Sequence, residues 1–135
     1  IRSCLFALEL KQPLSHFHET ILAELDAKDW TGIRNFVYSE HRSAIASLSR
    51  FVSDEAEAGN NDARTILDAA AHELNALKSR MQHELGAYSQ KVVLAGGVLT
   101  EGSYAANALI KLIGTKAVIG NVDIARKAAL LAYKA

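Results

Sequence analysis

The sequence predicts an α/β fold that is rich in helix and ends in a short parallel βαβα unit. Over residues 1–89, apolar side chains recur at three- and four-residue steps, which is the spacing of amphipathic helices. From Gln90 onward, two short apolar runs alternate with helical patterns, so their strands should lie parallel in one sheet with a right-handed crossover. We therefore expect a helical segment at 1–89 and a βαβα unit at 90–135, within one domain.

Apolar periodicity predicts three short helices at the start of the chain. The first two lie within residues 2–10 and 14–25, and they are separated by Pro13, which cannot continue a helix. The third begins near Asp29, whose carboxylate can cap the first turn, and runs to Tyr38.

Two longer helices follow. One opens at Ser39 or Glu40 and is stopped by Gly59. Residues 60–62 are expected to form the turn and the cap of the next helix. That helix covers residues 63–85, which is about six turns.

The character of the sequence changes at residue 90. A β-branched run predicts a buried strand at 91–95, followed by a helix at 102–113, a strand at 117–119 and a last helix at 123–134. Two strands alone make a marginal sheet with exposed edges. We therefore expect further strands from residues absent here or from another chain, and we interpret the sequence, which opens with Ile1, as part of a longer protein.

Composition excludes several function classes. Fifteen basic residues balance fifteen acidic ones and no long run of like charge occurs, so nucleic-acid binding is not expected. Cys4 is the only cysteine, which rules out an intrachain disulfide and a cysteine-ligated cluster within one chain. No apolar stretch of about 18 residues and no signal peptide is present, so we expect no membrane association and a cytoplasmic location.

Residues 93–98 are the most informative segment. Gly96 and Gly97 stand at the carboxyl end of a buried strand, where a ligand can approach the backbone without obstruction from a Cβ atom. A Gly-Gly turn between a strand and a helix also occurs for structural reasons alone. Tyr104, one turn into the following helix, is placed for a contact with the same ligand.

Residues 93–98 match the adenosine motif of the actin-like ATPase superfamily. Together with matching segments elsewhere, they make nearly the whole chain resemble the C-terminal domain of the BadF/BadG/BcrA/BcrD-type ATPase family, in its N-acetylglucosamine kinase, glucosamine kinase and archaeal hexokinase branch. The other matching segments are Tyr38-Ser39, Ile45-Ala46, Ala58-Gly59-Asn60, Asp62-Ala63, Ile66-Leu67, Glu73-Leu74 and 130–134.

The resemblance implies the C-terminal part of an actin-like (ribonuclease H-like) ATPase domain, in a two-domain kinase that closes on ATP and a sugar. The nucleotide would lie against Ala95, Gly96, Gly97, Val98 and Tyr104. In the family, the phosphate hairpins and the catalytic aspartate precede this region. The resemblance therefore gives no catalytic residue here, places the magnesium ion mainly on residues outside this sequence, and implies that this chain alone is inactive.

The expected partners are the nucleotide, the sugar, and the missing N-terminal half or another chain. A homodimer is also possible.

Two positions depart from the family pattern. Asn60 replaces a frequent aspartate, which caps a helix equally well, and Lys127 replaces a frequent glycine, which could alter how the last helix approaches the sheet. The single Cys4 does not reproduce the cysteine pattern of the family's iron–sulfur branch.

Two alternative functions are left open. The first is a related ATPase that couples hydrolysis to a partner protein, without a sugar substrate. The second is a non-catalytic interaction module in which the apolar faces of residues 40–58 and 63–85 pack against a partner.

A metal site at His16 and His18 is disfavoured because the two side chains point in different directions on a helix. A nucleophilic role for Ser3 has no support because no base stands near it in the sequence.

Overall fold

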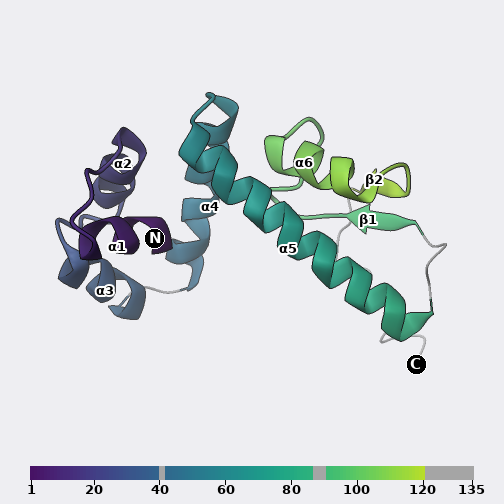
Figure 1. The fold of residues 1–135 in the computed structure, drawn as a ribbon, viewed down its shortest axis with the longest axis horizontal. Helices are drawn as coiled ribbons and strands as arrows, with labels where there is room; N and C mark the ends of the chain where they lie inside the picture. Colours follow the sequence, from purple (N-terminus) through teal and green to yellow (C-terminus); the bar gives the residue numbers. More distant parts are fainter. Residues whose placement is uncertain (40–41, 87–90, 121–135) are drawn as a thin grey trace. The chain divides into compact units, whose positions relative to one another are not determined.

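The structure is a computed structural model that describes residues 1–39, 42–86 and 91–120 (Figure 1). It divides into two compact units, residues 1–64 and 65–135. The predicted last helix at 123–134, together with Lys127, lies outside the described residues. In chain order the elements are α1 (Arg2–Glu9), α2 (His16–Glu24), α3 (Trp30–Ser39), α4 (Arg42–Glu57), α5 (Asn61–Leu85), β1 (Val92–Leu94), α6 (Tyr104–Ile113) and β2 (Ala117–Ile119).

Side-chain caps fix the starts of α2 and α3, and the predicted cap at Asp29 is confirmed. The helix α2 begins two residues later than the predicted residue 14, and Ser39, one of two predicted starts of the following helix, is the last residue of α3. Pro13 lies between α1 and α2, and Ser15 is the N-cap of α2 in a reciprocal capping box with His18. The carboxylate of Asp29 accepts a 2.9 Å hydrogen bond from the main-chain N–H of Gly32 in the first turn of α3. Each cap satisfies a main-chain donor that the helix itself leaves unpaired.

A small apolar core holds the first unit together. Cys4, Phe17 and Ile33 are its largest fully buried side chains, contributed by α1, α2 and α3. The ring of Phe17 stacks on that of Phe51 from α4, with centroids 6.0 Å apart. Asn60 caps α5, because its Oδ1 accepts hydrogen bonds from the first-turn N–H groups of Asp62 and Ala63. The helix begins at Asn61, two residues earlier than predicted, so Asn61 and Asp62 lie in α5 and not in a turn.

The second unit contains the two strands, and they are parallel as predicted. The register pairs Val92 with Ala117, Val93 with Val118 and Leu94 with Ile119. The connection between them is α6, which begins two residues later than the predicted Gly102 because Ser103 is its N-cap. The hydroxyl of Ser103 accepts a hydrogen bond from the N–H of Ala106, so residues before the cap stay outside the helix.

One face of the sheet packs on helices. Leu94 of β1 is buried with Ala71 of α5 and Leu109 of α6, and residues around this core include Val92, Leu99, Ala108, Ile110, Ile113 and Ala117. Figure 1 shows α5 and α6 beside the two strands. Since side chains alternate along a strand, Val93 and Val118 lie on the other face, where they are 56% and 44% exposed. The unit is therefore a helix-rich α/β arrangement.

Among the described helices, none is both long enough and apolar enough to cross a membrane.

Candidate functional site

The turn that follows β1 has the conformation that its glycines permit. Gly96 has a φ of 141°, a region that residues with a side chain rarely adopt, and its carbonyl oxygen accepts a 3.1 Å hydrogen bond from the N–H of Leu99. Gly97 needs no such conformation, and a Cβ atom built on it would meet no atom within 4 Å. The first glycine thus shapes the turn, while the second leaves space beside it open.

A hollow of about 260 Å³ opens where this turn meets α5. It lies at the carboxyl end of β1, the position where open α/β sheets bind ligands. The described residues that line it are small or apolar, and none of them is charged. We call it the glycine hollow, and it is formed by Leu67, Ala70, Ala71, Leu74, Ala95, Gly96, Gly97, Val98, Leu99 and Ala105. Its volume lies below the roughly 300–1,000 Å³ of pockets that enclose whole ligands, so it suits one ring system of a larger molecule.

Four of the five predicted site residues therefore lie together, and the fifth lines a different hollow. Ala95, Gly96, Gly97 and Val98 all line the glycine hollow. Tyr104 lines a neighbouring hollow of about 390 Å³, which has Ala71 in common with the first and is otherwise formed by Asp68, His72, Asn107, Ala108, Lys111 and Leu112. The Tyr104 hydroxyl donates a 3.2 Å hydrogen bond to Oδ2 of Asp68.

The helical wall of the glycine hollow was not predicted from the sequence. Leu67, Ala70 and Leu74 have the spacing of the apolar face of an amphipathic helix, which does not by itself indicate a ligand site. The available signal was the run of three alanines at 69–71, because small side chains on a helix leave room for a ligand beside a turn.

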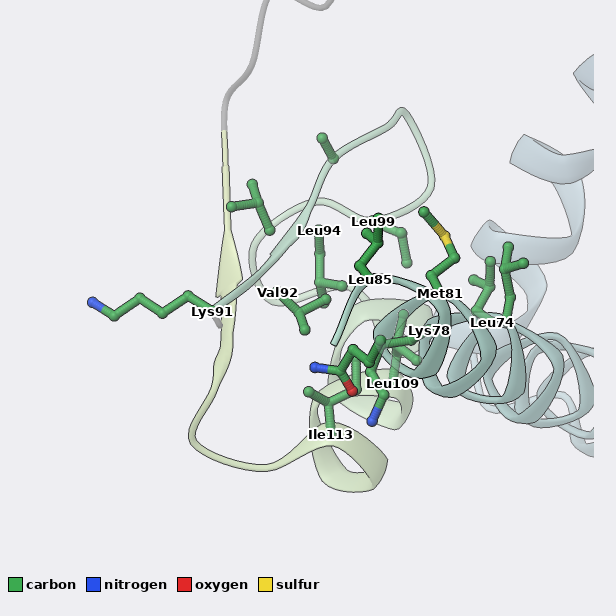
Figure 2. Close-up of a pocket in the computed structure, with 14 residues that line it drawn as sticks. Leu74, Lys78, Met81, Leu85, Lys91, Val92, Leu94, Leu99, Leu109 and Ile113 are labelled. Carbon is green, nitrogen blue, oxygen red and sulfur yellow. The ribbon is translucent and has the colours of Figure 1, made fainter. Parts of the chain in front are cut away.

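A larger groove lies on the other half of α5, and Figure 2 shows it with its lining side chains. Its volume is about 470 Å³, and among the described residues that line it only Lys78 and Lys91 are charged. We call it the α5 groove; it is lined by Leu74, Leu77, Lys78, Met81, Gln82, Leu85, Lys91, Val92, Val93, Leu94, Ala95, Leu99, Leu109 and Ile113. The leucines and the methionine from α5 are 41–72% exposed, although their spacing is typical of a buried face.

The first unit contains a hydrogen-bonded chain of polar side chains. Ser3 Oγ lies 2.6 Å from His18 Nε2, so a base that the sequence did not reveal is adjacent to this hydroxyl. The hydroxyl of Ser15 in turn donates a 2.6 Å hydrogen bond to Oδ2 of Asp62. None of the three hollows described above is lined by Ser3, and the bonds join α1, the cap of α2 and the first turn of α5. We interpret this chain as a structural connection.

The side chains of the described residues form no metal centre. Across residues 1–39, 42–86 and 91–120, no group of three or more histidine, cysteine, aspartate or glutamate side chains is arranged to hold a metal ion. Cys4, the only cysteine, is fully buried, and burial raises the pKa of its thiol above the ordinary value of 9.0. A thiol in this environment is a poor nucleophile.

Comparisons of the chain with protein-family models, with curated proteins and with solved structures found no match.

Proposed function

We propose that this chain is the C-terminal, nucleotide-binding part of an ATP-dependent sugar kinase with an actin-like (ribonuclease H-like) ATPase domain. The sugar would be N-acetylglucosamine, glucosamine or a hexose, as the resemblance to the BadF-type ATPases implies. The observation that carries the proposal is the glycine hollow, in which four residues of the adenosine-like motif face α5 at the carboxyl end of β1.

The chemistry of the glycine hollow favours an uncharged, flat group. Alanines 70, 71, 95 and 105 keep its walls shallow, and the open space above Gly97 admits a ring close to the backbone. Burying such a ring against apolar walls is favourable, while the backbone of the turn offers hydrogen-bonding groups for its edge. An adenine base has these properties, so the proposal seats the base here.

The phosphates need a different environment from the base. Their charge requires cations, backbone N–H donors and magnesium, and none of the described residues that line the glycine hollow is charged. In the proposal these groups, together with the carboxylate that activates the sugar hydroxyl, come from polypeptide outside this sequence. The role of this chain is to bind and orient the nucleotide.

A turnover assay tests the kinase proposal on the longer polypeptide of which we propose this chain is a part. ADP formation would be measured with ATP and magnesium, in the presence and absence of N-acetylglucosamine, glucosamine and glucose. Sugar-dependent ADP formation with a phosphorylated sugar product is the expected result. ADP formation that no sugar stimulates would favour the partner-coupled ATPase, and no nucleotide turnover or binding would contradict both.

The exposed apolar face of α5 favours a second candidate function, a helical interaction module. Leu74, Leu77, Met81 and Leu85 repeat at three- and four-residue steps and are 41%, 45%, 53% and 72% exposed. Surfaces of this kind commonly mark protein–protein contacts. This candidate predicts that the protein binds no nucleotide and that a bulky residue at position 97 changes nothing.

A further inference from the structure

The hollow that Tyr104 lines contains side chains of both charges. We call it the polar hollow, after its polar lining residues Asp68, His72, Tyr104, Asn107 and Lys111. Its volume of about 390 Å³ lies within the roughly 300–1,000 Å³ of ligand pockets. Its described lining residues all come from α5 and α6, so these walls are the same whether or not further strands join the sheet.

The floor of the polar hollow consists of small side chains at the place where the two helices pack together. Ala71 of α5 is buried in one apolar cluster with Leu109 of α6, and Ala108 packs against that cluster. Both alanines line the hollow. Their short side chains leave space for a ligand between the longer polar side chains of the two helices.

One carboxylate lines the polar hollow among the described residues, and a neighbouring hydroxyl orients it. The hydroxyl of Tyr104 donates a 3.2 Å hydrogen bond to Oδ2 of Asp68. An ionised carboxylate has about four acceptor sites on its two oxygens, so Asp68 can also accept hydrogen bonds from a ligand. The strongest such donor is a cationic group such as an ammonium.

Basic side chains lie further along both helices. Lys111 follows Tyr104 by about two turns of α6, and His72 follows Asp68 by about one turn of α5. Among the described residues, neither Lys111 nor His72 is paired with a carboxylate. The ammonium of Lys111 and an imidazole N–H of His72 are therefore available to a carboxylate on a ligand.

This combination of charges restricts the ligand. An anion such as phosphate would be attracted by Lys111 and repelled by Asp68, and a simple cation would meet the reverse. A small molecule that carries both an ammonium and a carboxylate offers a partner to each side chain.

We propose that the polar hollow binds a free α-amino acid, whose ammonium pairs with Asp68 and whose carboxylate pairs with Lys111 and His72. The proposal does not depend on nucleotide binding, because the described linings of the polar hollow and the glycine hollow have only Ala71 in common.

An NMR titration tests this proposal. L-Alanine, L-leucine and L-glutamine are added separately to the isotope-labelled protein at neutral pH, and the amide shifts of residues 68–72 and 104–111 are followed. At least one amino acid should give saturable shifts there, with a dissociation constant in the millimolar range or below. Its N-acetyl derivative lacks the ammonium and its amide lacks the carboxylate, so each should bind roughly fivefold or more weakly. Absence of saturable shifts with all three amino acids contradicts the proposal.

Crossed variants separate recognition from loss of folding. Lys111→Gln should weaken binding of the amino acid roughly fivefold and should have little effect on its amide, which has no carboxylate to lose a partner. Asp68→Asn should weaken the amino acid similarly and should have little effect on the N-acetyl derivative. Glu73→Gln removes a charge from an exposed position of α5 outside the polar hollow, so it should bind the amino acid like the wild type.

A glycine variant distinguishes this proposal from the proposed nucleotide site. Gly97→Val obstructs the glycine hollow and does not touch the lining of the polar hollow, so amino-acid binding should be unchanged. ATP with magnesium should not displace the amino acid. Displacement by ATP would assign the polar hollow to the nucleotide instead. Equal losses for the amino acid and both derivatives in Lys111→Gln and Asp68→Asn would assign these side chains a purely structural role.

Discussion

The hydroxyl of Tyr104 donates a 3.2 Å hydrogen bond to Oδ2 of Asp68, and this bond joins the first turn of α6 to α5. Both helices border the glycine hollow, through Ala105 on α6 and through Leu67, Ala70, Ala71 and Leu74 on α5. The pair therefore lies beside the hollow and connects two of its walls, while the Tyr104 side chain itself lines the neighbouring hollow.

Replacing Tyr104 with phenylalanine tests what this connection contributes. Tyr104→Phe keeps the ring and removes the hydrogen bond to Asp68, which should lower the free energy of unfolding by about 0.5–1.5 kcal/mol. ATP affinity should fall less than in Gly97→Val, because the ring does not line the glycine hollow. Urea unfolding and calorimetry measure the two effects, and an affinity loss equal to that of Gly97→Val would instead assign Tyr104 a direct nucleotide contact.

The two glycines of the turn should respond differently to alanine. Gly96→Ala forces a side chain into a backbone conformation with φ of 141°, so it should destabilise the protein by roughly 1–3 kcal/mol. Gly97→Ala should change stability by less than about 1 kcal/mol, because its Cβ meets no atom within 4 Å. Thermal unfolding of the two variants side by side measures this difference, and equal losses would show that the described turn is wrong.

The N-cap of α2 should be important for the stability of the first unit. Ser15→Ala removes the hydroxyl that accepts from the N–H of His18 and donates to Asp62, so it should cost about 1–2 kcal/mol of unfolding free energy. Ser53→Ala is the matched control, since its exposed hydroxyl donates to the carbonyl of Ser49 within α4, and it should change stability by less than about 0.5 kcal/mol. Urea unfolding monitored by circular dichroism compares the two variants.

The buried thiol of Cys4 should react slowly and should make stability depend on alkaline pH. Because burial raises its pKa above 9.0 in the folded protein, the folded state favours the neutral thiol. This contribution to stability is complete below the pKa of the unfolded thiol, and it is lost as pH rises through that of the folded one. The difference in unfolding free energy between wild type and Cys4→Ala should therefore shrink above pH 9.

The thiol reactivity of Cys4 can be measured directly. A colorimetric disulfide reagent at neutral pH should modify Cys4 roughly tenfold or more slowly in the folded protein than in urea. Equal rates would show that the side chain is accessible.

Helix boundaries could be predicted from the sequence because they depend on local chemistry. Pro13, Asp29 and Asn60 act on their own neighbouring residues, and the structure confirms all three. The two strands and their parallel pairing were also predictable, since a helical pattern between two short apolar runs restricts the connection. The start of α6 was misplaced by two residues because Ser103 was not interpreted as its cap.

The parts of the site that depend on tertiary packing were less predictable. The turn at 95–98 could be found from the glycines, but its wall on α5 depends on how that helix crosses the strand. Periodicity also assigns Leu77 and Met81 to a buried face, whereas both are about half exposed in the structure. A hydrophobic pattern shows that a face is suited to burial and does not show what covers it.

The most direct test of the proposed function is ATP binding by calorimetry with magnesium, on the wild type and on Gly97→Val, using both this chain and the longer polypeptide. A Cβ atom at position 97 meets no atom within 4 Å, so valine should enter the open space beside the turn, keep the fold and obstruct the glycine hollow. Ser79→Val, on an exposed part of α5 outside the hollow, is the control.

We predict that the longer wild-type polypeptide and the Ser79→Val control bind ATP, and that Gly97→Val lowers the affinity by roughly a hundredfold, or about 2.7 kcal/mol. Binding that Gly97→Val leaves unchanged, or a longer wild-type polypeptide that binds no ATP, would contradict a nucleotide site at this turn.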